Sequence, residues 1–205
     1  MDYAASVQWL GTMREDGAHN ASQFGFELAC AVAAQPGGRR LLRCLQPQTG
    51  ALQWLLTFAG EQPLQQFFDD SHDLWFSHFS QLTSSESPTT LRTLLSSYRQ
   101  PLRQARVLLQ FIFPLRQSAR LEHLADQLIP AVQEAQHYAG FIGAEVLLNV
   151  QDNSLQLLLF WHDSQGCQRY TADKPAIITR AIEQLAAVMY KPQAFVVLGV
   201  SGGTQ

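Results

Sequence analysis

The pattern of apolar and polar positions along the chain predicts a series of strands and helices. In the second half, branched and aromatic residues over 106–114 predict a strand, and apolar residues at helical spacing predict a helix over 121–137. Ser118 can cap this helix, and Pro130 is expected to kink or break it because proline lacks a backbone donor. The other elements predicted in this half are strands at 143–150, 154–161 and 194–200, a turn at 151–153, and helices at 163–172 and 174–189.

The first half repeats this order of elements with weaker signals. A polar stretch at 84–88 is expected to form a loop, and residues 98–104 are the expected linker between the halves. The order in each half is β-α-β-β-α-β, which is the ferredoxin-like arrangement. The elements predicted in the first half are strands at 4–13, 40–47, 51–59 and 90–98, and helices at 22–35 and 63–82.

The two halves align with each other without gaps at an offset of 103 residues. Gly37 matches Gly140, and the paired residues Leu52-Gln53 match Leu155-Gln156. Such an alignment indicates two copies of a domain of roughly 100 residues, which is close to the usual domain size. We therefore predict domains at residues 1–100 and 101–205.

The third predicted strand of each copy is apolar on both faces. In residues 155–161, Leu158 and Phe160 point away from the side on which the odd-numbered residues lie. Both faces of such a strand must be covered. Two helices can cover one face of each sheet, and the other face needs a second sheet. The predicted fold class is α+β, with two tandem ferredoxin-like (βαββαβ) units whose antiparallel sheets pack into an intrachain α/β barrel of the kind usually built by a homodimer.

Composition narrows the range of partners. A formal net charge of −3 with only 14 Lys+Arg argues against a nucleic-acid partner. The densest basic group, Arg39, Arg40 and Arg43, is interpreted as the solvated start of a strand. Three cysteines without metal-ligand spacing are interpreted as buried, inert thiols in a reducing compartment. No apolar run approaches the 18 residues typical of a membrane span, so we expect a cytoplasmic protein with no membrane partner and no metal.

Two segments of the second copy resemble a known family. Residues 138–146 (YAGFIGAEV) are similar to the "pGf.g.ev" segment that opens the second strand in the antibiotic biosynthesis monooxygenase group of dimeric α/β barrel proteins. Residues 159–164 (LFWHDS), with Tyr170 and Lys174-Pro175, resemble the group's "W-e-s … h … sP" passage. The resemblance covers residues 104–200, and the internal repeat extends it to the first copy.

The resemblance implies a ferredoxin-like fold with a pocket between sheet and helices in each unit. Members of the group include cofactor-independent monooxygenases, heme-degrading enzymes, isomerases and cyclases. This chain departs from their catalytic patterns. Heme-degrading members have an Asn on the first strand, where this chain has Gln110 or Gln8. They also have a His on the following helix, and near its place this chain has Tyr170 or Phe67. Where quinol-oxidising members have a polar amide and a Tyr, it has Leu157 and Cys167. The resemblance therefore predicts the fold of this chain more strongly than it predicts an activity.

The second copy holds the first group of candidate substrate-binding residues, Trp161, Tyr170, Tyr138 and His162. Trp161 matches the family's Trp, and Tyr170 keeps a hydroxyl where the first copy has Phe67. Because one copy of a duplicated site is free to become scaffold, we expect a working site around these residues. The alternative is that Trp161 is a core aromatic residue and that the tyrosines pack with exposed hydroxyls.

The first copy holds a rival group on one predicted helix. Phe68, His72, Trp75 and Phe79 recur at helical spacing, and His78 flanks them. This aromatic stripe with imidazoles could hold a planar ligand and transfer a proton. The alternative is a helix packed on the sheet with His72 at its margin. His72 and His78 face different sides of a helix, so shared metal coordination is not expected.

Two functions follow from these patterns. The first is a cofactor-independent oxygenase, or a related isomerase or cyclase, acting on an aromatic or polyketide-like small molecule. The second is a non-catalytic binding or interaction protein whose sites are filled by core side chains. The expected ligand is a small aromatic or apolar molecule, no cofactor is expected, and the pseudo-dimers can assemble further into a homodimer.

Overall fold

The computed structural model describes residues 4–14, 18–116, 123–173, 176–188 and 192–202, so the predicted Ser118 cap lies outside the described residues. The chain divides into two compact units, Met1–Arg92 with Val196–Gln205, and Thr93–Phe195. These boundaries fall inside two strands, while the domain boundary inferred from the duplication stays a prediction. Among the described residues, no helix has the length and apolar character needed to cross a membrane.

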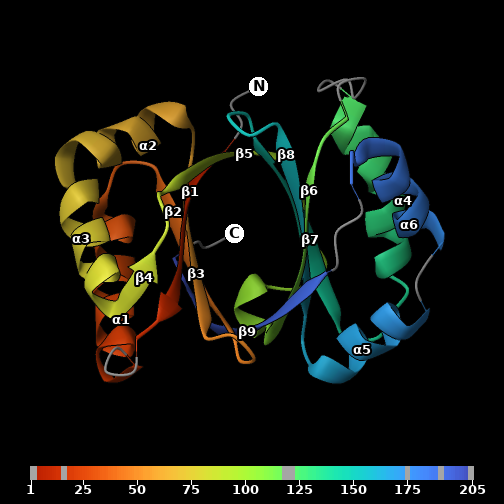
Figure 1. Ribbon diagram of the computed structural model, residues 1–205, viewed down its shortest axis with the longest axis horizontal. Helices are drawn as coiled ribbons and strands as arrows, with labels where there is room; N and C mark the ends of the chain where they lie inside the picture. Colours follow the sequence, from red (N-terminus) through yellow and green to blue (C-terminus); the bar gives the residue numbers. More distant parts are fainter. Residues whose placement is uncertain (1–3, 15–17, 117–122, 174–175, 189–191, 203–205) are drawn as a thin grey trace. The chain divides into compact units, whose positions relative to one another are not determined.

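The first unit contains a sheet with β3 at its centre. β3 pairs antiparallel with β1 and β2, β5 pairs with β1, and the end of β9 pairs with β2. Figure 1 shows α1, α2 and α3 on one side of these strands. The elements of this unit are β1 (Ala5–Met13), α1 (Ala18–Ala34), β2 (Gly38–Gln46), β3 (Ala51–Phe58), α2 (Glu61–Phe67), the π-helical segment η1 (Phe68–His72), α3 (Asp73–Leu82), β4 (Thr83–Ser85), the start of β5 (Thr89–Tyr98) and the end of β9 (Gln193–Ser201).

The second unit repeats this arrangement around β8, which pairs antiparallel with β6 and β7. In Figure 1, α4, α5 and α6 lie on one side of these three strands. The elements are η2 (Leu102–Gln104, a 3-10 helix), β6 (Val107–Pro114), α4 (Leu124–Ala135), β7 (Phe141–Asn149), β8 (Ser154–Trp161), α5 (Ser164–Asp173) and α6 (Ala176–Leu185). The hydrogen-bonded strand order is β9-β2-β3-β1-β5 in the first unit, with β4 also paired to β1, and β9-β6-β8-β7-β5 in the second.

The sequence repeat is also a repeat of backbone geometry. β2 and β7, and likewise β3 and β8, begin and end at positions 103 residues apart. Pairing shifts register between Gly38 and Arg40 in the first hairpin, and at the matching residues of the second. The hairpin turn holds a left-handed residue in both copies, Gly50 with φ 70° and Asn153 with φ 47°. Glycine and asparagine tolerate this conformation best.

Both central strands are buried on both faces, as their lack of alternation predicted. All residues of β3 and β8 after the first are buried. On the side that carries the helices, the first unit gathers its core around Trp9, Leu28, Trp54 and Phe79. The second unit gathers its core around residues of β6, β7 and β8 together with α4, α5 and α6.

Three local features differ from the sequence prediction. α4 continues through Pro130 to Ala135, so the helix does not end at the proline. The predicted helix at 63–82 is divided by the π-helical segment η1. The polar stretch predicted as a loop at 84–88 begins as the short strand β4, which pairs with β1.

Candidate functional site

Two tryptophans stand side by side on the helix-facing side of the first unit. Trp9 on β1 and Trp54 on β3 are direct cross-strand partners, and both are buried. The ring of Phe79 on α3 lies 5.6 Å from the Trp9 ring and 5.3 Å from the Trp54 ring. These residues are the centre of what we call the first-unit aromatic cluster: Trp9, Phe24, Trp54, Phe67, Phe68, His72, Trp75, Phe76, His78 and Phe79.

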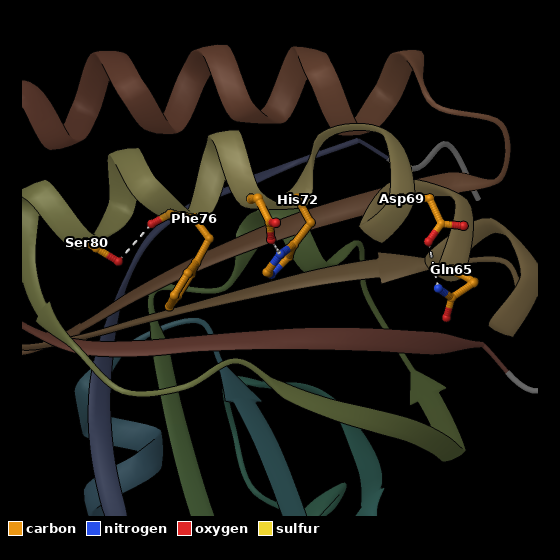
Figure 2. A network of polar contacts seen from close by, with 6 residues as sticks. Gln65, Asp69, His72, Phe76 and Ser80 are labelled. Atoms are coloured by element: carbon orange, nitrogen blue, oxygen red, sulfur yellow. Dashed lines mark hydrogen bonds and ion pairs between the residues drawn. The ribbon is translucent and has the colours of Figure 1, made fainter.

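His72 is buried within this cluster at the end of the π-helical segment. Its imidazole lies 4.3 Å from the Phe68 ring, 5.5 Å from the stacked Phe76 ring, and 5.7 Å from Trp9, edge on. Figure 2 shows the His72 and Phe76 side chains directed from the helix toward the strands. π-helical segments occur often at functional sites, because the inserted residue redirects the side chains around it. Because His72 is buried among these rings, it does not lie at the margin of the helix face that packs on the sheet.

The polar atoms of this cluster combine one acceptor with two donors. His72 Nδ1 lies 3.1 Å from Asp73 Oδ1, while Nε2 is buried without a hydrogen-bond partner among the described residues. The indole Nε1 atoms of Trp9 and Trp54 are likewise buried and unpartnered in the described part of the chain. When Nδ1–H donates to Asp73, Nε2 becomes the acceptor of the ring. Such a set can accept a proton from a ligand and donate hydrogen bonds to an anion.

The other two first-copy candidates, Trp75 and His78, join the cluster through Phe24. The Phe24 ring lies 5.8 Å from both of their rings and stacks on Trp54 at 5.1 Å. Trp75 is half-buried and His78 is exposed, whereas His72 is buried. The two histidines therefore face different surroundings, as the helical spacing predicted.

The second unit brings together three of the four residues predicted there. The Tyr170 ring lies 5.2 Å from the Trp161 ring and 5.1 Å from the Tyr138 ring, edge on. Trp161 Nε1, the Tyr170 hydroxyl and Glu134 Oε2 are buried without partners among the described residues. Burial, followed by the Glu134 carboxylate, raises the pKa of Tyr170 above its ordinary value, so its hydroxyl stays protonated.

His162 lies apart from this group. Its side chain is 60% exposed, and Nδ1 is 3.7 Å from Asp163 Oδ2. Asp163 accepts a hydrogen bond from the Gly166 backbone N–H at 2.9 Å near the start of α5, which lowers the pKa of its carboxyl. The described residues contain no group of three His, Cys, Asp or Glu side chains that could hold a metal.

The two copies carry their polar aromatic residues at positions of the sheet that do not correspond to each other. The Trp9 and Trp54 pair of the first copy corresponds to the Phe111 and Leu157 pair of the second, as the strand registers show. The pair Trp161 and Tyr170 corresponds to Phe58 and Phe67, whose rings are also 5.2 Å apart. Sequence reasoning missed the contributions of Trp9, Asp73 and Glu134. The contribution of Trp9 could have been predicted from a strand register that places it opposite Trp54.

The three thiols differ in exposure, and we expect them to differ in reactivity. Cys44 and Cys167 are buried but Cys30 is exposed, so the prediction of three buried thiols is wrong for Cys30. Burial raises the pKa of Cys167 to about 11 and that of Cys44 well above its ordinary value.

Because the thiolate is the nucleophile, iodoacetamide at about pH 8 should modify Cys30 alone in the folded protein. Peptide mass spectrometry would measure this, with urea-unfolded protein as the control in which all three react. Equal labelling of Cys167 and Cys30 in the folded state would contradict it.

The fold resembles that of several solved structures across nearly the whole chain. An anthrone oxidase-like protein has a TM-score of 0.73 at 11% identity, covering 98% of this chain and 94% of that one. A candidate monooxygenase from Fusobacterium nucleatum has a TM-score of 0.72 at 8% identity, covering 98% and 95%. A candidate monooxygenase from Lactobacillus acidophilus has a TM-score of 0.69 at 10% identity, covering 98% and 97%.

No protein-family model and no curated protein sequence matches the chain. At these low identities the likeness concerns the fold. The α+β class and the ferredoxin-like units predicted from the sequence are confirmed. The chain shares the fold of these monooxygenase-like structures over nearly its whole length, with two ferredoxin-like units in a single chain.

Proposed function

We propose that the protein is a cofactor-independent monooxygenase that binds an aromatic or polyketide-like small molecule at the first-unit aromatic cluster. One observation carries the proposal: His72 is buried among aromatic rings, with Nδ1 on Asp73 and Nε2 without a partner among the described residues. An imidazole placed in this way can act as a general base toward an acidic C–H or O–H of a planar ligand. The fold of the monooxygenase-like neighbours supports the same class of reaction.

The proposed chemistry uses electrons from the substrate itself. His72 Nε2 removes a proton from a methylene group made acidic by a neighbouring aromatic ketone, and the indole N–H groups of Trp9 and Trp54 stabilise the resulting anion. The anion then reduces dioxygen: one oxygen atom replaces the two methylene hydrogens as a carbonyl, and the other leaves as water. The apolar surroundings remove water from the base and the anion, which strengthens both interactions.

The reaction can be tested with anthrone, whose name is carried by one structural neighbour. We expect the protein to accelerate oxygen uptake by anthrone and to release the corresponding quinone, measured with an oxygen electrode and by absorbance against the uncatalysed reaction. A fully substituted analogue without methylene hydrogens should bind without consuming oxygen. Binding of both compounds with no acceleration would favour the alternative, a non-catalytic binding protein of the same fold.

The two copies can be compared by matched substitutions. We expect Trp54→Leu, which installs the residue found at the matching second-copy position, to weaken ligand binding at least about tenfold, because stacking area and an indole donor are lost. Trp161→Phe, which installs the residue of the first copy, should leave binding within about twofold. Fluorescence titration would measure both dissociation constants. The opposite pattern would place the working site at Trp161, Tyr170 and Tyr138, as the sequence alone had indicated.

A further inference from the structure

A basic side chain adjoins the first-unit aromatic cluster on the same side of the sheet. Arg43 on β2 is the direct cross-strand partner of Trp54, which is in turn the partner of Trp9. Directly paired residues project from the same face of a sheet. Arg43, Trp54 and Trp9 therefore form a row across three strands, with Arg43 at the end away from Trp9.

Two glycines leave the space in which the Arg43 guanidinium lies. A Cβ on Gly25 of α1 would sit 2.2 Å from Nη1 of Arg43, and a Cβ on Gly199 of β9 would sit 2.6 Å from Nη2. A Cβ at either position would force the guanidinium to move away. A glycine inside a helix costs roughly 1 kcal/mol relative to alanine, and Gly25 stands in the middle of α1. The guanidinium thus occupies a position that the surrounding backbone leaves open for it.

The charge of Arg43 is not neutralised by the described residues. Among the described residues, its only hydrogen bond is from Nη1 to the Ser22 carbonyl oxygen at 3.4 Å, and its Nε is buried without a partner. None of the ion pairs among the described residues involves Arg43. Burial lowers the pKa of the guanidinium, which reflects the cost of holding a cation out of water. A half-buried guanidinium with free donors is suited to a planar anion, because its fork matches a carboxylate.

We propose that Arg43 binds a carboxylate carried by the aromatic ligand of the first-unit cluster. This inference rests on the proposed function and names the substrate class: an aromatic acid. Neighbouring strands are about 4.8 Å apart, so Arg43 and Trp9 are separated by roughly 10 Å across the sheet. A ligand of two or three fused rings with the carboxylate at one end spans this row and presents its other end near His72, which contacts Trp9.

The test compares an acid with its neutral amide. Titration calorimetry would measure the binding of 2-naphthoate and 2-naphthamide to the full chain and to three variants: Arg43→Gln, Gly25→Ala, and Arg39→Gln as a control at an exposed arginine of the same strand. We expect the full chain to prefer the acid by about tenfold or more, as charge-assisted hydrogen bonds allow. Arg43→Gln should remove the preference without changing amide affinity, and Arg39→Gln should retain it.

Gly25→Ala tests whether the position of the guanidinium matters, because this variant moves the group without removing it. The new methyl group displaces the guanidinium while improving helix propensity, so acid preference should fall although the melting temperature does not. No preference in the unmodified chain, no binding of the acid at millimolar concentration, or an equal loss for both probes in Arg43→Gln would overturn the inference. Acid preference without oxygen uptake counts against the proposed reaction alone, and oxygen uptake without acid preference counts against the role of Arg43 alone.

Discussion

Replacing His72 with glutamine is expected to reduce turnover of an anthrone-type substrate by at least about a hundredfold while leaving its binding nearly unchanged. Glutamine fills most of the volume of the imidazole and keeps a polar end, but it cannot take a proton. A positioned general base contributes about 10²- to 10⁴-fold to rate, and His72 Nε2 is the buried acceptor proposed for this step. Steady-state oxygen uptake would give kcat, and fluorescence titration would give the dissociation constant.

The matched control is His123→Gln, because the His123 side chain is 53% exposed and lies in the second unit. It should keep full turnover. A decrease in both variants would point to a general effect on folding, which circular dichroism would detect. Unchanged turnover in a folded His72→Gln protein would remove His72 from the mechanism, and the choice would then return to the tyrosines of the second unit.

Gly38→Ala is expected to lower the free energy of unfolding by about 4 kcal/mol or to prevent folding. A Cβ on Gly38 would lie 1.7 Å from the carbonyl oxygen of Val32 and 2.9 Å from its carbonyl carbon. Both contacts are with backbone atoms, so no side chain can move aside. The last turn of α1 would have to shift away from β2, and the hydrogen bond of 2.9 Å from Gly38 N to Gln35 O would be lost.

Gly50→Ala provides the matched comparison for this experiment. Among the described residues, a Cβ there would meet only a methyl group of Thr12 at 3.8 Å, so the expected cost is about 1 kcal/mol, caused by the left-handed φ of 70°. Urea unfolding followed by circular dichroism would measure both variants. Similar stabilities for the two proteins would show that α1 and β2 tolerate a wider separation than the structure has.

The sequence predicted the hairpins best, because turn chemistry and strand pattern agree there. Residues 151–153 supplied a turn, the flanking residues supplied apolar strands, and the offset of 103 residues carried both to the first copy. The helix at 63–82 was predicted as one segment, since periodicity alone does not reveal the extra residue of a π-helical segment. Of the kink or early break predicted near Pro130, the break did not occur, and apolar residues on both sides of the proline, Leu128, Ala131 and Val132, are buried in the core.

The candidate site was harder to predict because it depends on contacts between distant segments. Trp9 became significant only when the register of β1 on β3 placed it opposite Trp54. Arg43 was interpreted as part of a solvated strand start, since nothing in its local sequence reveals that Gly25 and Gly199 lie against it. Residue type suggested His72, Trp161 and Tyr170, but burial and partners could come only from the folded chain.

The pairing of β2 with the end of β9 has a consequence for synthesis of the chain on the ribosome. Leu41 pairs with Ser201 and Leu45 with Val196, so the first unit lacks this neighbouring strand until residues 196–201 have been made. During that interval the outer edge of β2 has unpaired backbone donors and acceptors, which invite pairing with other chains. The first unit is therefore begun before the second but can be completed only after residues 93–195 have been made, and its sheet cannot finish folding before β9 has left the ribosome.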